Sequence, residues 1–195
     1  KKRKQLRKQR ENSVIVDERI VTYMHSLEKP NNNVLEEIEQ QAHIDGVPII
    51  RKEMESFLRV MLTITKPKRI LELGTAVGYS AILISECLDE DGKITTIENY
   101  EKRIPIARNN FKRAGQEEQI TLIEGDALEV MKTLEGPYDF IFMDAAKGQY
   151  IHFMPDILRM KNFKVSQTMV LLEMWLCNSL IPKEKEINFK DSTKE

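Results

Sequence analysis

The sequence predicts an α/β fold with a doubly wound, mostly parallel sheet, preceded by N-terminal helices and followed by an atypical or truncated C-terminal part. Two observations predict it. Short apolar runs that fit buried strands alternate with helical segments from residue 69 to residue 160, and repeated βα units of this length favour right-handed crossovers in a parallel sheet. One strand also runs directly into a glycine turn and a helix, as in α/β folds that hold nucleotide-like ligands.

Three helices are expected before the sheet, at residues 17–29, 34–42 and 51–64, separated by turns rich in Asn, Gly and Pro. The first carries apolar residues on one face: Ile20, Val21, Met24 and Leu27. The third repeats apolar residues at helical spacing: Met54, Phe57, Leu58, Met61 and Leu62. We interpret this second stripe as core packing rather than as a cofactor-binding face.

Strands are then predicted at residues 69–73, 93–98, 119–124 and 138–143, with a further plausible strand at 168–172. Helices are predicted at 79–88, at 101–114, in a short segment ending at 134, and near 151–160. Gly115 directly follows the second of these helices, where a left-handed residue is expected. The 195 residues fit a single domain with a substantial core.

Composition excludes some classes of protein. Apolar residues make up 41% and charged residues 31% of the chain, as in soluble globular proteins. No run of 18 apolar residues predicts a membrane span, and no apolar segment after the basic N-terminus resembles a signal peptide. We therefore expect a cytoplasmic protein without membrane contact, in which Cys87 and Cys177 are free thiols.

The positive charge is concentrated at the N-terminus. Residues 1–10 hold seven of the 30 basic residues and no acid, which leaves 23 basic and 31 acidic residues, a net charge of −8, in the remainder. A basic arm on an acidic body could contact RNA phosphates. Such arms are more often disordered, so we expect residues 1–15 to form a disordered basic arm.

The glycine turn lies in the stretch ILELGTAVGYS, residues 70–80. Gly74 and Gly78 are four residues apart, so the spacing matches neither the dinucleotide-binding fingerprint nor the P-loop. Glu72 stands just before the first glycine, where a carboxylate would repel a pyrophosphate but suits a cationic ligand. Similar turns also occur in α/β proteins that bind nothing there. The pattern E-x-G-x-x-x-G resembles the first motif of S-adenosylmethionine (SAM)-dependent methyltransferases, whose cofactor carries a sulfonium and an ammonium.

Polar residues also end the next three predicted strands. Glu98 follows Gly74 by 24 residues and could accept hydrogen bonds from both hydroxyls of a ribose. Asp126 follows the third strand, where it could accept from an adenine amino group, and Asp144 and Lys147 follow the fourth. Ligands of such sheets bind beyond the carboxyl ends of the strands. Together these residues predict a binding site for an adenosyl amino acid.

Residues 16–160 resemble the metal-dependent class I O-methyltransferases, the family of catechol and caffeoyl-CoA O-methyltransferases, with a Rossmann-like SAM methyltransferase fold. The segments VPII (47–50), ELGTAVGYSA (72–81) and FMDAAKGQY (142–150) are most similar to its small bacterial branch. That branch includes the enzyme that methylates 5-hydroxyuridine in tRNA to 5-methoxyuridine. These segments are specific for the family but less so for the tRNA substrate, because close relatives methylate catechols.

The resemblance implies a site for SAM and for Mg²⁺ or another divalent cation. Glu72, Gly74, Thr75 and Ser80 would line the methionine part of the cofactor, Glu98 the ribose, and Asp126 and Ala127 the adenine. Ile50 would precede a helix that covers the cofactor. Asp144 would bind both the metal and the cofactor ammonium, and Lys147 would act as a general base. The alternatives are a helix-capping Asp144 and a solvated Lys147.

The resemblance fails after Met160. The family continues with a Gly-Gly turn, a strand and an Asp-Asn pair that completes the metal site, but here Leu172 and Glu173 fall at the pair. Leucine cannot bind a metal, so Glu173 is the remaining candidate ligand. A frameshift, missing segments and true divergence stay open as causes. Residues 16–180 would form the methyltransferase domain, and residues 181–195 a polar tail expected to be disordered.

We therefore expect an enzyme, a metal-assisted SAM-dependent O-methyltransferase that acts on 5-hydroxyuridine in tRNA. Two alternatives stay open: a catechol-type enzyme for small hydroxylated aromatics, and a SAM-binding protein that is inactive because of its divergent C-terminal part. Members of the family are commonly dimers, so the resemblance also implies a homodimer as a possible assembly.

Overall fold

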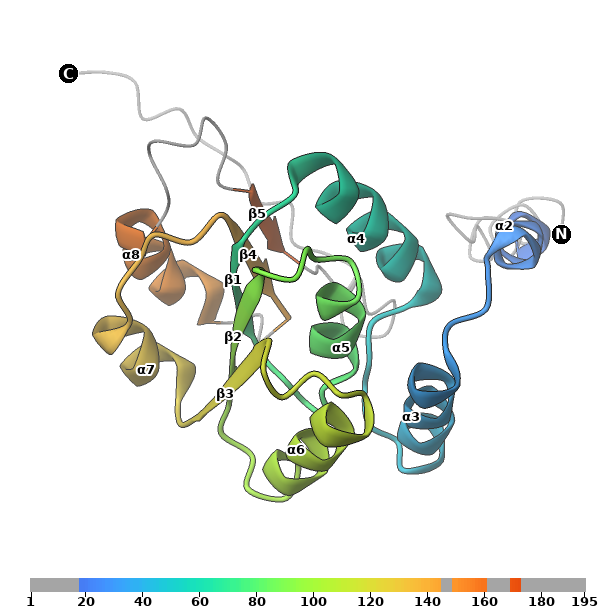
Figure 1. The fold of residues 1–195 in the computed structure, drawn as a ribbon, viewed down its shortest axis with the longest axis horizontal. Coiled ribbons are helices and arrows are strands. Elements are labelled where there is room, and N and C mark those ends of the chain that lie inside the picture. Colours follow the sequence, from blue (N-terminus) through green and yellow to red (C-terminus); the bar gives the residue numbers. More distant parts are fainter. Residues whose placement is uncertain (1–17, 145–148, 161–168, 173–195) are drawn as a thin grey trace, which may run out of the picture.

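The computed structural model describes residues 18–144, 149–160 and 169–172. Its strands form one five-stranded sheet in the order β3-β2-β1-β4-β5, and every pair of neighbours is parallel (Figure 1). The strands are β1 (Arg69–Leu73), β2 (Lys93–Glu98), β3 (Ile120–Glu124), β4 (Phe140–Met143) and β5 (Met169–Leu172). The predicted doubly wound parallel sheet is thereby confirmed.

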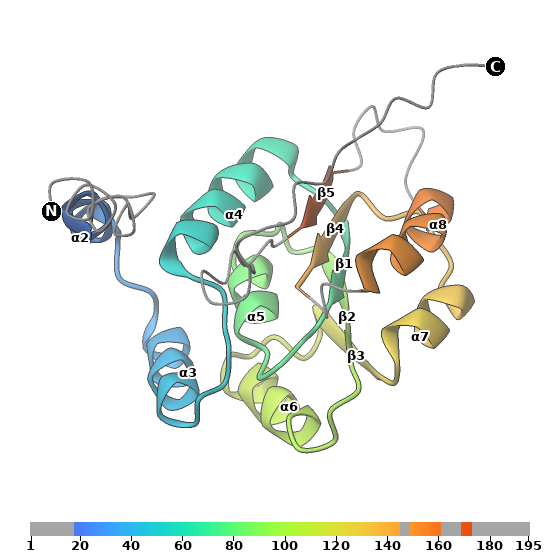
Figure 2. The same ribbon diagram turned by 180° about the vertical axis from the view of Figure 1, so that it is seen from behind.

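Helices cover both faces of the sheet (Figures 1 and 2). One face is covered by α4 (Lys52–Thr65), α5 (Tyr79–Ser85) and α6 (Ile104–Arg113), with α3 (Asn33–Ile44) outside them. The other face is covered by α7 (Ala127–Thr133) and α8 (Tyr150–Met160). None of the described helices is both long enough and apolar enough to cross a bilayer.

The central strand β1 is buried on both faces. Ile70 belongs to the apolar cluster beneath α3 to α6, whereas Leu71 and Leu73 belong to the cluster beneath α7 and α8. Strands of this kind are recognisable as nearly continuous apolar runs. Glu72 is the exception, since it is a carboxylate with no exposed surface inside this strand.

The predicted elements recur with shifted boundaries. The helix expected over residues 101–114 begins at Ile104, because residues 101–103 form a turn and Pro105 suits the first helical turn. The helix expected over 79–88 ends at Ser85, and the strand expected over 138–143 begins at Phe140. The domain limits near residues 15 and 180 lie outside the described ranges and stay predictions.

Helix α2 (Glu18–Leu27) does not place its apolar face in the core. Ile20, Met24 and Leu27 are 54%, 44% and 65% exposed, and the views show α2 apart from the sheet (Figures 1 and 2). Polar contacts join it to α4: His25 Nε2 lies 3.1 Å from Glu53 Oε1, and the Glu28 carboxylate after the helix accepts from Ser56 Oγ at 3.3 Å.

The apolar stripe of α4 is only partly in the core. Leu58 and Leu62 are fully buried as predicted, but Phe57 is 45% exposed. Glu55 is buried on the same side of the helix as the two leucines. The prediction of core packing was therefore wrong for Phe57, because the buried side of the helix is centred on Glu55, Leu58 and Leu62 and Phe57 lies to one side of it. Glu55 has polar partners on α5 and on the segment before α3.

Alanine substitutions at two glycines test the packing of the glycine turn. Gly78, the N-cap of α5, has φ +86°, and an added Cβ would lie 2.6 Å from the Phe111 ring. Gly115 has φ +66° but nothing within 4 Å of an added Cβ. We expect Gly115→Ala to lower the free energy of unfolding by about 1 kcal/mol and Gly78→Ala by about 2–4 kcal/mol, because overlap with the ring is added. Urea unfolding curves measure both, and equal costs would contradict the ring contact.

Candidate functional site

Polar residues meet at the carboxyl edge of the sheet, as the sequence predicts. Glu98, Asp126 and Asp144 stand at or just after the ends of β2, β3 and β4, and Gly74 of the glycine turn follows β1. Main-chain hydrogen bonds tie these strand ends together. Asp144 N donates to Leu73 O at 3.0 Å, and Gly125 N donates to Glu98 O at 2.9 Å. The four positions therefore border one region at the centre of this edge.

The turn between β1 and α5 uses left-handed backbone at three positions, with φ of 100° at Gly74, 47° at Ala76 and 86° at Gly78. Ala76 is the unusual one, because an alanine in this conformation is strained. Its N–H donates to Glu98 Oε2 at 2.7 Å, which offsets the strain. Asn110 of α6 adds a second tie, since its side-chain amide donates to Val77 O at 2.8 Å.

Glu98 is a buried hydrogen-bond acceptor between the turn and the end of β2. Besides Ala76 N, it accepts from Asn99 N at 3.0 Å and from Tyr100 N at 2.9 Å, and the residue is only 8% exposed. A carboxylate has about four acceptor positions, so these three donors leave capacity for a ligand hydroxyl. Glu98, the residue predicted to bind the ribose, therefore lies at this edge with capacity to accept one more hydrogen bond, and the ribose contact stays a prediction.

Glu72 lies beneath the turn. Its carboxylate oxygens accept from Ser80 Oγ and from Thr96 Oγ1, each at 2.5 Å, and the Thr96 hydroxyl lies 2.6 Å from that of Thr75. Burial raises the pKa of Glu72 to about 7; the two hydroxyl donors oppose this, and the nearby Asp144 and Glu98 carboxylates add to it. Glu72 and Ser80 therefore bind each other here, and their contact with a cofactor stays a prediction.

Asp126 caps α7. Its Oδ1 accepts from Leu128 N at 2.9 Å, and the side chain is exposed at the carboxyl edge. Ala127 is the first residue of α7 and is half-buried. Capping engages one carboxylate oxygen, so the geometry is compatible with the predicted adenine contact and does not test it.

Of the residues predicted to bind the metal or act as base, only Asp144 is within the described residues. It follows β4 and is partly exposed. Lys147 and Glu173 lie outside the described residues. Within those residues, no three His, Cys, Asp or Glu side chains are grouped so that they could bind a metal ion. One carboxylate does not make a metal site, so the roles of Lys147 as base and Glu173 as ligand stay predictions.

A groove of about 1710 Å³ lies between α2, α3 and the start of α4. Ile50, which is almost fully buried, borders it, whereas the predicted site residues on the strands and the glycine turn do not. Glutamates outnumber the lysines and arginines in its wall: Glu28, Glu36, Glu39, Glu53, Glu55 and Glu86 against Lys29, Arg51, Lys52 and Arg59. The groove is thus an acidic hollow among the N-terminal helices, and none of the strand ends borders it.

Reasoning from the sequence missed a set of polar residues that connects this groove to the start of α5: Asn31, Lys52 and Glu55, which line the groove, and Tyr79, the first residue of α5. One signal was present in the sequence. Glu55 stands three and seven residues before Leu58 and Leu62, so it lies on the apolar side of a helix where an acid must have a buried partner.

Comparison with known proteins agrees with this geometry. A sequence model of a family described as O-methyltransferase matches residues 24–186. A catechol O-methyltransferase from Niastella koreensis is 35% identical over 121 residues, 59% of this chain and 55% of that protein. Caffeoyl-CoA O-methyltransferase 2 from Populus trichocarpa is 36% identical over 107 residues, 50% of this chain and 42% of that protein. The chain therefore spans about half the length of these relatives.

A solved methyltransferase structure has a similar fold. The SAH-bound structure of a methyltransferase from Podospora anserina matches 80% of this chain and 68% of its own, with a TM-score of 0.73 and 30% sequence identity.

Glu72→Gln is expected to remove a pH dependence of stability. The native pKa of Glu72, about 7, lies above its ordinary value of 4.5, so the folded state binds this proton more tightly than the unfolded chain. Wild-type stability therefore falls as the pH rises from about 4.5 to about 7, by about 2–3 kcal/mol from this residue. Chemical unfolding of both proteins near pH 5 and pH 8, without ligands, measures the effect. A stability difference between them that is equal at both pH values would contradict it.

Proposed function

We propose that this chain, which belongs to the O-methyltransferase family, transfers the methyl group of SAM to a hydroxyl oxygen. The observation that carries the proposal is the convergence of the glycine turn, Glu98, Asp126 and Asp144 at one edge of the sheet. The SAH-bound relative from Podospora anserina supports it, because SAH is the product that remains when SAM has lost its methyl group.

The charge at this edge suits a cationic cofactor. Glu72 is fully buried, and its charged form is disfavoured by burial and by the carboxylates of Asp144 and Glu98. A cation bound above the turn would favour that charged form, because opposite charges at short range stabilise each other. SAM supplies a sulfonium-bound methyl group. A phosphate-bearing cofactor would instead add negative charge to a region that already holds three carboxylates.

In methyl transfer, the chain would hold SAM and the acceptor in line and take the proton of the acceptor hydroxyl. Holding two reactants in line can supply about 7–11 kcal/mol of the barrier reduction. Lys147 is our candidate to take the proton of the acceptor hydroxyl, as a lysine with a lowered pKa can. Asp144 and Glu173 are the candidates to hold a divalent ion, which would stabilise the deprotonated acceptor oxygen.

We favour a small hydroxylated aromatic of the catechol type as the acceptor. The relatives are named for catechol and caffeoyl-CoA methylation. Outside residues 1–10 the chain carries a net charge of −8, which opposes binding to RNA phosphates. The second candidate is 5-hydroxyuridine in tRNA, supported by the segment FMDAAKGQY at residues 142–150 and by the basic residues 1–10.

Transfer of labelled methyl groups from SAM tests both acceptors. Catechol, caffeoyl-CoA and bulk tRNA are offered separately, each with Mg²⁺ and with EDTA. We expect label in catechol or caffeoyl-CoA, stimulated by Mg²⁺. Label in tRNA alone would establish the second candidate instead, and SAM binding without transfer to any acceptor would indicate an inactive cofactor-binding protein.

Lys147→Ala is expected to lower kcat by about 10²–10⁴-fold with little change in SAM affinity, because it removes the proposed proton acceptor. Lys132→Ala is the matched control, since Lys132 is an exposed lysine of α7 bonded to Glu129. Steady-state rates at saturating Mg²⁺ measure both. Normal turnover by Lys147→Ala would exclude the role of this lysine as the base.

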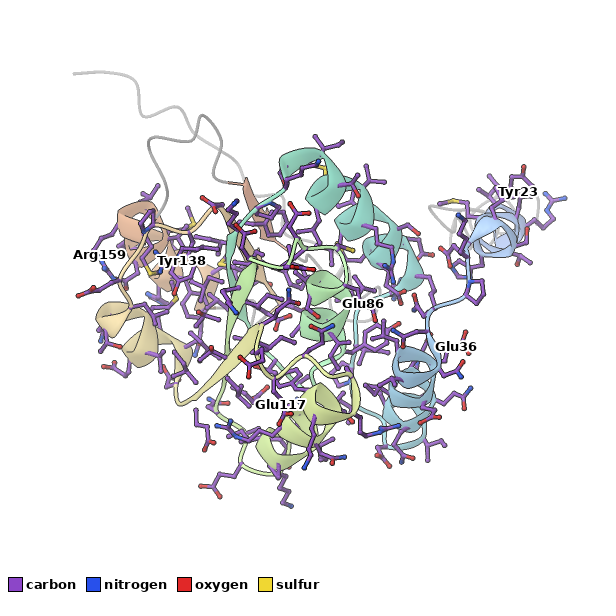
Figure 3. All side chains as sticks on the ribbon, in the orientation of Figure 1. Tyr23, Glu36, Glu86, Glu117, Tyr138 and Arg159 are labelled. Atoms are coloured by element: carbon purple, nitrogen blue, oxygen red, sulfur yellow. The ribbon has the colours of Figure 1, made fainter. Side chains whose placement is uncertain are left out.

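We also propose that the protein forms a homodimer through its exposed apolar surface. Phe57, Val60 and Ile64 of α4 are 45%, 55% and 70% exposed, and Tyr23 of α2 is 63% exposed (Figure 3). A ten-residue helix such as α2 is marginal in water unless its apolar face is packed. A second copy would cover both faces.

Light scattering tests this assembly, with a mass near twice 22.7 kDa expected for the wild type. Phe57→Asp should shift the protein to the monomer. Ile106→Asp should leave the mass unchanged, since Ile106 is 44% exposed but belongs to α6. A monomeric wild type would exclude the homodimer.

A further inference from the structure

The first turn of α5 is tied in two directions. Ser80 donates inward to Glu72 of β1, whereas Tyr79, the residue before it, reaches outward to α4. The Tyr79 hydroxyl donates to Glu55 Oε1 at 2.7 Å, and Tyr79 itself is only 1% exposed. Because Gly78 directly precedes Tyr79, any shift of this ring along or across the helix would move the end of the glycine turn.

Glu55 is held in place by further donors. Asn31 Nδ2 donates to its Oε2 at 2.9 Å, and Lys52 Nζ lies 3.1 Å from its Oε1. Burial lowers the pKa of Lys52, but its bonds to Glu39 and Glu55 outweigh burial and keep the pKa raised. Burial and Glu55 together raise the pKa of Tyr79, so its hydroxyl stays a donor. A buried network with all its members paired specifies one arrangement.

The same residues reach the other end of α5. Asn31 also accepts from Arg59 Nη2 at 2.8 Å, and Arg59 Nη2 lies 3.7 Å from the carboxylate of Glu86. Glu86, the C-cap of α5 and labelled in Figure 3, also accepts from the side-chain amide of Asn32. The segment before α3 and the helix α4 thus contact α5 through polar side chains at both of its ends.

We propose that Glu55 and Asn31 are positioning residues for the cofactor site and that they act through Tyr79. Their bonds fix the distance between α4 and the first turn of α5, and that turn carries Ser80 and ends the glycine turn at Gly78. Neither residue borders the carboxyl edge itself. The inference rests on the proposed function, because it assigns these residues a role toward the cofactor expected at the turn.

A purely structural role would weaken folding without a selective effect on the ligand. Ser85 offers a matched comparison, because it is also buried in α5, but its hydroxyl donates at 2.7 Å to Ile82 O of the same helix. Ser85→Ala therefore removes a buried hydroxyl from α5 and leaves the bonds to α4 and to the segment before α3 intact.

Calorimetric titration of the full chain with S-adenosylhomocysteine tests the proposal, at a temperature where unfolding curves show each variant to be folded. Tyr79→Phe and Glu55→Leu should each weaken binding about five- to tenfold, as expected when one buried hydrogen bond no longer fixes a binding turn. The double variant should lose little more than either single one, since both remove the same link. Glu55→Gln, which keeps an acceptor for Tyr79, should bind more tightly than Glu55→Leu.

The control separates positioning from stability. Ser85→Ala should bind with wild-type affinity even where its unfolding midpoint is lowered. Wild-type affinity in Tyr79→Phe and Glu55→Leu, or an equal loss in Ser85→Ala, would overturn the proposal while leaving the proposed function intact. Absence of binding to the wild-type chain would overturn the proposed function, and this inference with it. If Glu55→Leu does not fold, Tyr79→Phe decides, because it also removes the bond to Glu55.

Discussion

The carboxylate of Glu72 is the constraint on which the strand-end site depends. It stands in β1, at the centre of a sheet that is covered by helices on both faces, so it has no access to water. A buried carboxyl group must find hydrogen-bond donors, and Glu72 finds them on Ser80 of α5 and Thr96 of β2. One acid therefore fixes the central strand, the next strand and the first turn of α5 relative to each other.

The glycine turn is consequently held by side chains as well as by its own backbone. Glycines at 74 and 78 can adopt left-handed conformations, but they can also adopt many others, so they do not fix the conformation of the turn by themselves. Selection comes from Glu98, which accepts from Ala76 N, from Asn110, which donates to Val77 O, and from the inward and outward ties of α5.

The strands and the polar residues at their ends could be predicted from the sequence because both are local signals. Residues 69–73 and 93–98 were predicted with the observed limits, since both are short runs rich in aliphatic or β-branched residues that follow turn residues. The Glu55 cluster could not be predicted in full. Periodicity shows that Glu55 shares a face with Leu58, but its partners Asn31 and Tyr79 are 24 residues away on either side. The exposure of Phe57 and of the α2 face depends in the same way on packing between distant segments.

Charge at the carboxyl edge links ligand binding to protonation. Burial raises the pKa of Glu72, and the nearby Asp144 and Glu98 carboxylates add to the rise because they repel its charged form. A cationic ligand above the turn would relieve this repulsion and favour the charged form of Glu72, so its affinity would gain from deprotonation at about pH 7. A neutral ligand of the same shape would gain nothing. The thioether product keeps the ammonium group and loses only the sulfonium charge, so Glu72 would contribute to discrimination between the two ligands through that one charge.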